Sequence, residues 1–276
     1  MGEQHFGPAV IGRHYDERSP IGDELRDGQL HMWYWYGEQD PTSLADAVTR
    51  VSHKVCETLG LRPGETVLDA GCGPGETAVR LARDHAVDVT GITLSEYEIG
   101  RATERARAAG VEHLAHFGYG DFAALSFAEG TFDAVLALES LQNAQDIGAA
   151  LSELFRVLRP GGRLSLSDFS LESDADPQRI ATFMSTLKLG VLPTLDQWLE
   201  LVRGAGFDVE EYTQCGPRVF GMKAKYLRDA MGRRADIAGK FGGPALSAYA
   251  RDHQGFFVPR KGQIGYVIVS ARKPLP

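Results

Sequence analysis

A glycine-rich segment between an apolar run and a helical segment is the part of the sequence best suited to bind a ligand. Residues 69–75 read Asp-Ala-Gly-Cys-Gly-Pro-Gly and follow Val67 and Leu68. Glycine permits positive φ in a sharp turn and lets the backbone approach a ligand without a Cβ in the way. A helix beginning at Glu76 would direct its free N–H groups at the same ligand, which favours a carboxylate or a phosphate. We therefore expect residues 69–75 to form a ligand-binding loop.

The spacing of the glycines narrows the choice of ligand. A nicotinamide-dinucleotide fingerprint has the pattern Gly-x-Gly-x-x-Gly, whereas these glycines fall at positions 71, 73 and 75. The third glycine comes one residue early, and Glu76 is a poor neighbour for a pyrophosphate. No Gly-Lys-Ser/Thr follows, so a P-loop is excluded. A dinucleotide-dependent oxidoreductase is therefore disfavoured.

Two acidic residues near the ends of apolar segments are candidates for acid–base chemistry. Glu139 follows residues 132–138, and Asp168 lies near the end of a second such segment. Both carboxylates are candidates for contact with the substrate or with the reacting atoms. Gln142 and Asn143 follow Glu139 closely and complete the candidate catalytic set. The alternative for Glu139 is that it only holds the geometry of its loop.

An aromatic cluster near the N-terminus suits a site where positive charge develops. Residues 31–36 read His-Met-Trp-Tyr-Trp-Tyr, and aromatic faces stabilise a neighbouring cation. Residues 184–192 favour an apolar substrate pocket. Core packing is the alternative for both segments. The candidate substrate contacts are Tyr15, Trp33, Trp35, Tyr36, Met184 and Leu187.

The elements that must position these residues alternate between strands and helices, which predicts βαβ units and a largely parallel sheet. Strands are expected at residues 67–70, 87–93, 113–119, 132–138, 163–169, 207–213 and 266–270. Helices are expected at residues 43–59, 76–85, 95–109, 147–158, 180–190 and 195–203. The predicted fold is a doubly wound, mostly parallel seven-stranded sheet with helical lid elements.

One domain over residues 1–276 accounts for this pattern. Residues 1–53 are expected to form an N-terminal lid that carries the aromatic cluster, and residues 54–216 the ligand-binding core. Residues 217–262 carry no strand signal and are expected to be a helical insertion of the lid, before the last strand within residues 263–276. Long insertions at such places commonly determine which substrate is accepted.

Composition excludes several classes of protein. Of 276 residues, 43% are hydrophobic and 24% are charged, as in a folded globular chain, and the net charge of −8 without a Lys/Arg cluster argues against a nucleic-acid partner. No apolar run reaches the about 18 residues of a membrane span, and no signal peptide is apparent. The three cysteines show no metal-binding spacing. We expect a cytoplasmic protein without a metal site; a homo-oligomer stays open.

Three motifs in order resemble those of class I S-adenosylmethionine-dependent methyltransferases. The loop at 69–75 resembles the first motif, Gly-Asp-Phe at 120–122 resembles the adenine-edge motif, and residues 156–164 resemble the late motif with its Pro-Gly-Gly turn. The resemblance implies S-adenosylmethionine as cofactor and S-adenosylhomocysteine as product. It further implies that Asp69 holds the amino end of the cofactor and that Asp121 accepts from the adenine amino group.

A closer resemblance covers most of the chain. Many members carry an acidic residue at the end of the second strand, but residues 91–95 read Gly-Ile-Thr-Leu-Ser. This is similar to small-molecule methyltransferases of bacterial natural-product pathways, including sugar O-methyltransferases of the rebeccamycin type. The similarity extends over residues 30–31, 34–35, 138–141, 167–169 and 265–274. The cofactor contacts that the resemblance implies are Tyr34, Asp69, Gly71, Cys72, Gly73, Gly75, Thr93, Ser95, Gly120, Asp121, Phe122 and Leu138.

One departure from that subgroup bears on the chemistry. The related sugar enzymes carry a His pair where this chain has Gln142 and Asn143, neither of which takes up a proton at neutral pH. Three explanations stay open. The acceptor is itself acidic, such as a phenol or enol; or another base acts, from the set Asp168, Glu139, His14 and His31; or the methyl acceptor is a carbon atom.

The function expected is therefore methyl transfer from S-adenosylmethionine to an oxygen or carbon of a small secondary metabolite. One alternative keeps the fold and uses the bound cofactor as a scaffold for a cyclisation or another rearrangement. A second alternative is a protein that binds the cofactor without catalysis.

Overall fold

The computed structural model describes residues 6–26 and 28–276 and contains one seven-stranded sheet of order β3-β2-β1-β4-β5-β7-β6. Within the described residues, β7 pairs antiparallel with both β5 and β6, and the other neighbouring strands pair parallel. The sheet confirms the predicted doubly wound, mostly parallel architecture. The strands are β1 (Thr66–Ala70), β2 (Asp88–Thr93), β3 (Ala115–Tyr119), β4 (Phe132–Leu138), β5 (Leu158–Leu171), β6 (Asp208–Gln214) and β7 (Ile264–Arg272).

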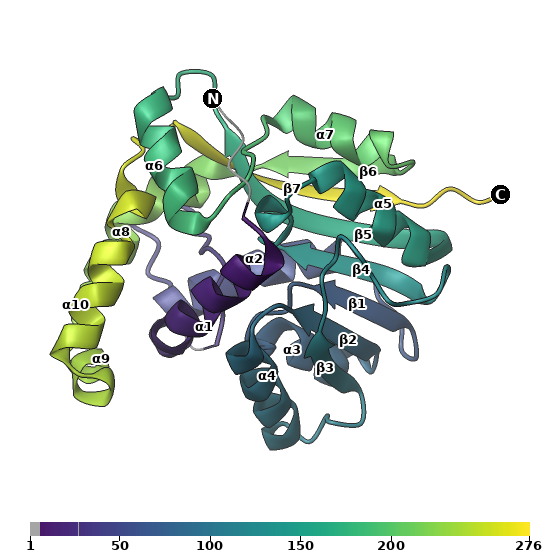
Figure 1. Ribbon diagram of the computed structural model, residues 1–276, viewed down its shortest axis with the longest axis horizontal. Coiled ribbons are helices and arrows are strands. Elements are labelled where there is room, and N and C mark those ends of the chain that lie inside the picture. Colours follow the sequence, from purple (N-terminus) through teal and green to yellow (C-terminus); the bar gives the residue numbers. More distant parts are fainter. Residues whose placement is uncertain (1–5, 27) are drawn as a thin grey trace.

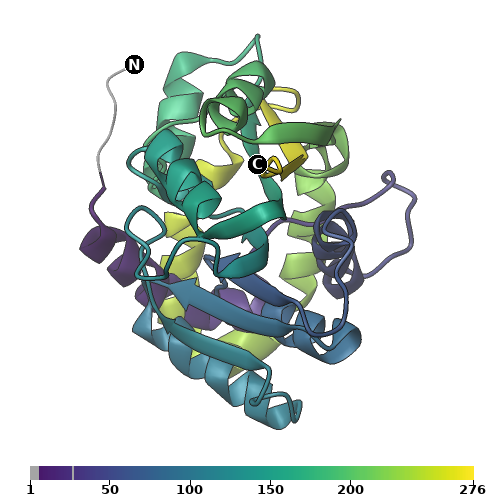
Figure 2. The ribbon, with the colours of Figure 1, turned by 90° about the vertical axis from the view of Figure 1, so that its right-hand side faces the viewer.

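Helices cover both faces of the sheet (Figures 1 and 2). One face carries α2 (Leu44–Glu57), α3 (Glu76–His85) and α4 (Glu96–Ala108), and the other carries α5 (Ile147–Val157) and α7 (Leu195–Gly204). Because side chains of a strand alternate between faces, the buried strand β4 supplies both layers. Leu136 and Leu138 pack in the first core, and Val135 and Ala137 in the second.

Side-chain caps fix where several helices begin. The Ser43 hydroxyl accepts from the backbone N–H of Asp46 at the start of α2, and the Asp146 carboxylate does the same for α5. Thr194 and Gln197 form a reciprocal capping box at the start of α7. Each cap satisfies backbone N–H groups that have no partner inside the helix. The first residues of α2, α5 and α7 agree with those predicted from the sequence within about one residue.

Further helices lie beside and over the carboxyl ends of the strands. The first is α1 (Pro8–Leu25), which packs against α4 and which periodicity did not predict because Pro20 interrupts its interior. Residues 217–262 fold into α8 (Lys223–Gly232), α9 (Arg234–Phe241), α10 (Gly243–Asp252) and the short turns η2 (Gly216–Arg218), η3 (Phe220–Met222) and η4 (Gln254–Phe257). These helices form an arm beside α1 and α6 (Pro177–Leu187) in Figure 1.

Gly75 joins the glycine loop to α3 at a point where no other residue fits. Its φ is +85°, and a Cβ built there would lie 2.5 Å from the Cβ of Ala102 on α4. The glycine is therefore required for the close packing of α3 on α4, and it does not line the cavity described below.

We expect Gly75→Ala to lower the free energy of unfolding by about 2–4 kcal/mol, because it adds both a strained backbone and an overpacked contact. Urea unfolding followed by circular dichroism measures this change. Gly232→Ala is the matched control, since a Cβ at Gly232 meets no atom within 4 Å. An unchanged unfolding midpoint for Gly75→Ala would contradict this account of the α3–α4 contact.

Candidate active site

A cavity of about 400 Å³ lies at the carboxyl ends of β1, β2 and β4. The glycine loop and the loops after β2 and β3 line one half of it, which we call the loop half. The other half, the aromatic half, lies under α1 and the arm formed by α8–α10. This is the place where open α/β sheets bind ligands, and the volume is typical of a small-molecule site.

The glycine loop brings a buried carboxylate to the loop half. Asp69, Gly71, Cys72 and Gly73 all line the cavity. Oδ2 of Asp69 is buried without a hydrogen-bond partner, and burial raises the pKa of this carboxyl to about 7. A buried carboxylate without a partner needs a donor, and an ammonium group supplies both donors and the compensating charge.

Gly71 lets the loop turn against the segment that follows β4. Its φ is +92°, and a Cβ there would lie 2.4 Å from the Cβ of Ser140. The hydroxyl of Ser140 donates to the carbonyl oxygen of Ala70 at 2.5 Å. The loop is therefore fixed to the residue that follows Glu139.

A second buried carboxylate of the loop half comes from a residue that sequence analysis missed. Glu98 on α4 lines the cavity and accepts hydrogen bonds from Thr93 Oγ1 and from Ser19 Oγ, each at 2.6 Å. Burial raises its pKa. Its signal in the sequence is its position three residues after the helix-capping Ser95. It places an acid beside the end of β2, where the strand itself ends in Thr93.

The remaining predicted residues of the loop half lie around its rim. Gly120, Asp121 and Phe122 follow β3, and Leu138 ends β4; all four line the cavity. Oδ1 of Asp121 accepts from the backbone N–H of Ala123 at 2.9 Å, which orders this turn. The carboxylate keeps further acceptor capacity toward the cavity.

Glu139 lies between the two halves and has an unusual backbone. Its φ is +52°, in the left-handed region that side chains larger than glycine rarely adopt. Oε1 accepts from the backbone N–H of Met32 at 2.6 Å and from the hydroxyl of Tyr266 at 2.7 Å. Oε2 takes no hydrogen bond from the described residues. Strained residues of this kind cluster at active sites.

The surroundings of Glu139 tune its proton affinity. Burial raises the pKa of Glu139 to about 7, against the opposing effects of the Met32 and Tyr266 hydrogen bonds and the Arg26 charge. A carboxyl with this pKa exchanges a proton readily near neutral pH, which is the property required of a general base or acid.

Gln142 and Asn143 lie on the turn η1 (Leu141–Asn143) and line the cavity. Nε2 of Gln142 donates to the carbonyl oxygen of Glu139, and its Oε1 is buried without a partner. Oδ1 of Asn143 accepts from the hydroxyl of Tyr15 at 2.9 Å, and Nδ2 donates to the carbonyl oxygen of Leu187 at 3.0 Å. Asn143 therefore connects α1 to the end of α6, and Tyr15 and Leu187 also line the cavity.

Asp168 is a correction to the predicted site, because it does not line the cavity. It is fully buried beneath η1, where Oδ2 accepts from the backbone N–H of Gln142 at 3.0 Å and Oδ1 from that of Phe169. Burial first, and the Glu139 charge second, raise its pKa. Asp168 therefore positions Gln142 rather than contacting a ligand.

Of the four aromatic residues at 33–36, Trp33 alone lines the cavity, which corrects three more predictions. Trp33 lines the cavity, stacks on Tyr226 with ring centroids 4.1 Å apart and donates from Nε1 to the carbonyl oxygen of Val219. Trp35 is fully buried and donates to the carbonyl oxygen of Thr42. Tyr34 and Tyr36 pack edge to face on the opposite side of the segment. The residues of the cluster outside the cavity lining are Tyr34, Trp35 and Tyr36.

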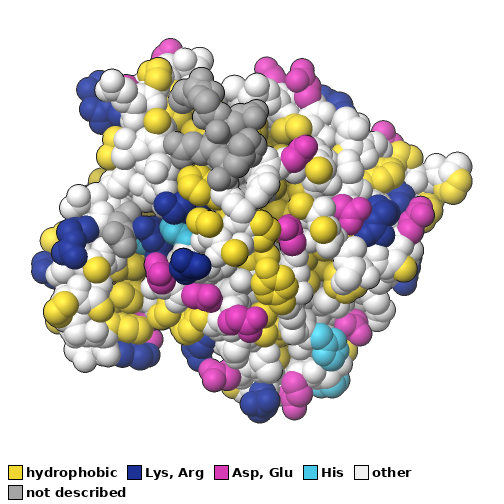
Figure 3. Space-filling view, viewed as in Figure 1, with side chains coloured by type: hydrophobic (Ala, Val, Ile, Leu, Met, Phe, Trp, Pro, Cys, Tyr) yellow, Lys and Arg dark blue, Asp and Glu magenta, His cyan; other side chains and the backbone are white. Residues whose placement is uncertain are grey.

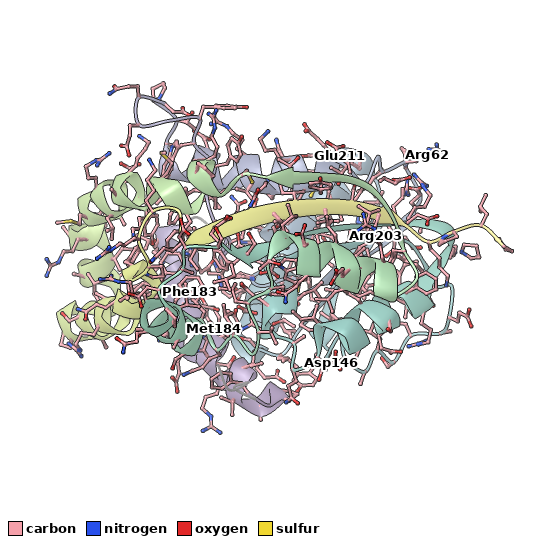
Figure 4. All side chains as sticks on the ribbon, turned by 90° about the horizontal axis from the view of Figure 1, so that it is seen from above. Arg62, Asp146, Phe183, Met184, Arg203 and Glu211 are labelled. Carbon is pink, nitrogen blue, oxygen red and sulfur yellow. The ribbon has the colours of Figure 1, made fainter. Side chains whose placement is uncertain are left out.

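Met184 and Ser95 also lie outside the cavity lining. Met184 lies on α6 beside Phe183 (Figure 4), whose ring packs against Phe169 and Phe256 in the core. Ser95 is fully buried, caps α4 and donates to Asp16 at 2.6 Å. Met184 therefore belongs to α6, and Ser95 stabilises the start of α4, outside the cavity.

Residues of the arm and of α1 complete the aromatic half, and sequence analysis did not identify them individually. Which side of a helix faces a cavity depends on the orientation of the helix, which local sequence does not encode. Figure 3 shows a histidine among basic side chains on the face between α1 and α6. The additional residues of this half are Arg18, Arg26, Tyr226, Tyr249, His253 and Phe256.

Three histidines line the cavity as neutral rings. Burial lowers the pKa of His14, His31 and His253 to about 3 in each case. Nδ1 of His31 lies 2.9 Å from the carbonyl oxygen of Met32, and its Nε2 is buried without a partner. The hydrogen bond to a carbonyl requires the proton on Nδ1, so Nε2 is an acceptor.

Comparison with known proteins agrees with this geometry. The model of the methyltransferase domain family matches residues 67–162. The 27-O-demethylrifamycin SV methyltransferase of Amycolatopsis mediterranei (strain S699) is 34% identical over 97% of this chain and 98% of its own length. An O-methyltransferase of Pyrenophora dematioidea is 36% identical over 73% of this chain and 76% of its own. The crystal structure of the (4+2)-cyclase SpnF has a TM-score of 0.84 at 28% identity, covering 100% of this chain and 99% of that chain.

The chain belongs to the class I S-adenosylmethionine-dependent methyltransferases. Within that class it is an enzyme of the subgroup that serves natural-product biosynthesis. The loop half fits the cofactor for two reasons. The Asp69 carboxylate has no partner and can bind the ammonium group of the cofactor, and the glycines of the loop let the cofactor approach the backbone closely. The resemblance to rebeccamycin-type sugar enzymes stays a prediction. None of the described helices is long and apolar enough to cross a membrane.

The raised pKa of Asp69 predicts pH-dependent cofactor binding. Only the ionised carboxylate holds an ammonium group strongly, so below the pKa of about 7 the cofactor must displace a proton. We expect affinity for S-adenosylhomocysteine to rise by up to about tenfold per pH unit below pH 7 and to level off above it. Calorimetric titrations between about pH 5.5 and 8.5 measure this.

Asp69→Asn should bind more weakly at the upper end of this range and lose the slope. Glu139→Gln is the control, because it removes the other carboxyl with a pKa of about 7 and should keep the slope. If the affinity of the wild type for S-adenosylhomocysteine does not change with pH, Asp69 does not bind the ammonium group of the cofactor.

Proposed function

We propose that the enzyme transfers the methyl group of S-adenosylmethionine to a hydroxyl oxygen of a bulky, largely apolar natural product. The proposal rests on the position and the pKa of Glu139. Its carboxyl group has a pKa of about 7 and lies between the loop half and the aromatic half. The names of two relatives, a rifamycin-directed methyltransferase and an O-methyltransferase, support oxygen as the acceptor.

The loop half holds the cofactor in this proposal. Asp69 binds its ammonium group, Glu98 accepts from the ribose hydroxyls, and Asp121 accepts from the adenine amino group. Each carboxylate lines the cavity. When bound, S-adenosylmethionine supplies an electrophilic methyl group on a sulfonium. The chain's contribution is to fix that methyl group toward the aromatic half and to keep water away from it.

The aromatic half receives the acceptor and orients its hydroxyl group. Trp33, Tyr226 and Phe256 form a wall of rings. Holding the hydroxyl oxygen at about 3–3.5 Å from the methyl carbon contributes several kcal/mol to the rate acceleration. Rings facing the reacting group also stabilise the positive charge that the methyl group carries.

Glu139 takes the proton in this proposal. Methyl transfer forms an oxygen–carbon bond, breaks a sulfur–carbon bond and releases the hydroxyl proton. Oε1 is held by Met32 and Tyr266, so Oε2 is the atom that accepts. His31 and His14 are weaker bases, because burial lowers the pKa of each to about 3.

A second candidate is cyclisation with the cofactor as scaffold. It rests on the similarity to SpnF and on the presence of Gln142 and Asn143 where related sugar enzymes carry histidines. Two amide side chains stabilise a polarised transition state without moving a proton. The mass of the product separates the candidates, since only methyl transfer adds a methyl group.

We further propose that residues 1–53 and 217–262 act as the lid over the core of residues 54–216, and that residues 263–276 close the sheet. The contacts of α1 with α9 and α10 support this division. The three buried free cysteines suit a reducing cytoplasm, and the net charge of −8 suits a small-molecule partner rather than a nucleic acid.

The test is an acceptor panel read by mass spectrometry. We expect a one-methyl gain on a member of a panel of macrocyclic polyketides with free hydroxyls, 27-O-demethylrifamycin SV included. Glu139→Gln should lower kcat by about 10²–10⁴-fold, the usual contribution of a general base, while affinity for S-adenosylhomocysteine stays within about twofold.

The matched control is Glu210→Gln, an exposed glutamate paired with Arg272 on the far edge of the sheet, which should leave kcat unchanged. Full turnover by Glu139→Gln would remove Glu139 from the mechanism. A product of unchanged mass would favour cyclisation.

A further inference from the structure

Two polar groups in the aromatic half have no partner and are not used by the proposed reaction. Nε of Arg26 is buried without a hydrogen bond, and no hydrogen bond or ion pair among the described residues involves its guanidinium. Tyr249 is 9% exposed, and its hydroxyl is buried and also lacks a hydrogen-bond partner. Both side chains line the cavity.

The two groups surround one point on α1. A Cβ built on Gly22 would lie 3.1 Å from Nη2 of Arg26 and 3.5 Å from the hydroxyl oxygen of Tyr249. Arg26 comes from the end of α1 and Tyr249 from α10, so the packing of the arm on α1 brings them together. A single small group can therefore contact both.

The charges of the aromatic half favour an anion at this point. Arg26 brings a buried cation, and the neutral rings of His14 and His253 add no negative charge. Among the described residues, Glu139 is a carboxylate whose charge acts on Arg26, from the boundary with the loop half, and Asp146 also lines the cavity. Buried cations and donors without partners are costly, so a ligand that supplies an acceptor oxygen gains strongly from binding here.

We propose that Arg26 and Tyr249 form an oxyanion subsite that binds an acidic oxygen of the acceptor, either a carboxylate or an ionised phenol or enol. The subsite anchors one end of the acceptor under the arm and leaves its reacting hydroxyl at Glu139. The guanidinium donates along its planar edge and the phenol supplies a further O–H donor. This proposal rests on the proposed function only in assigning the aromatic half to the acceptor.

The test uses binding rather than turnover, so that its result is independent of the acceptor panel. The protein is saturated with S-adenosylhomocysteine and titrated calorimetrically at about pH 7.5 with 2-naphthoate, with its neutral isostere 2-naphthamide, and with 2,4-dinitro-1-naphtholate. We expect the wild type to bind at least one of the two anions about tenfold or more tightly than the amide. The anion that binds more tightly identifies the carboxylate or the phenolate as the source.

Arg26→Gln should abolish this preference, and Tyr249→Phe should reduce it about threefold through the loss of one donor. The matched control is Arg228→Gln, because Arg228 lies on α8 in an exposed pair with Glu38 and outside the cavity lining. It should keep the preference. Unchanged affinity for S-adenosylhomocysteine shows that each variant is folded.

Equal binding of the anions and the amide by the wild type, or no binding of either anion, would overturn the subsite. A preference that survives in Arg26→Gln would overturn the role of Arg26. Neither result bears on methyl transfer itself, which the mass of the product reports separately. Loss of the preference in Arg26→Gln with its retention in Arg228→Gln is the supporting result.

Discussion

The site depends on the hydrogen bonds of Glu139, because they join three distant parts of the chain. Met32 of the aromatic cluster and Tyr266 of β7 both donate to one of its oxygens, and its own backbone N–H donates to Ser167 on β5. This network holds a residue with positive φ in place and fixes the N-terminal segment over the sheet. Removing the carboxylate would leave the backbone N–H of Met32 without a partner and the Tyr266 hydroxyl with Ser167 Oγ alone, which costs stability as well as function.

Several polar groups of the site are buried without a hydrogen-bond partner. Asp69, His31 and Gln142 each have a buried atom without a partner in the described part of the chain. Native proteins keep few such groups, and those they keep are commonly at ligand sites. The sheet makes this arrangement stable, because two apolar cores on its faces supply the packing while the carboxyl ends of β1, β2 and β4 carry the unpaired groups.

The sequence predicted the strands and the capped helices well, because both depend on local signals. In the loop half it missed Glu98, and the predicted contacts Gly75 and Ser95 lie outside the cavity lining. Strand alternation, helix caps and glycines at positive φ are encoded within a few residues, and β4 and α3 have the predicted bounds. The aromatic half was harder. Trp33 and Trp35 look alike in sequence, yet only Trp33 faces the cavity. Arg26 and Tyr249 acquire a role only when α10 packs against α1, a contact between residues more than 200 positions apart in the chain.

Residues at the ends of three successive strands, β1, β2 and β3, are inferred to bind the cofactor in the loop half. Calorimetric titration with S-adenosylhomocysteine, in wild type and in Asp121→Ala, tests this binding most directly, with Asp208→Ala on the exposed strand β6 as control. The account predicts a Kd in the micromolar range, about −8 kcal/mol, that Asp121→Ala loses and Asp208→Ala retains. An absence of binding to the wild type would contradict it and leave an α/β protein whose cavity serves another ligand.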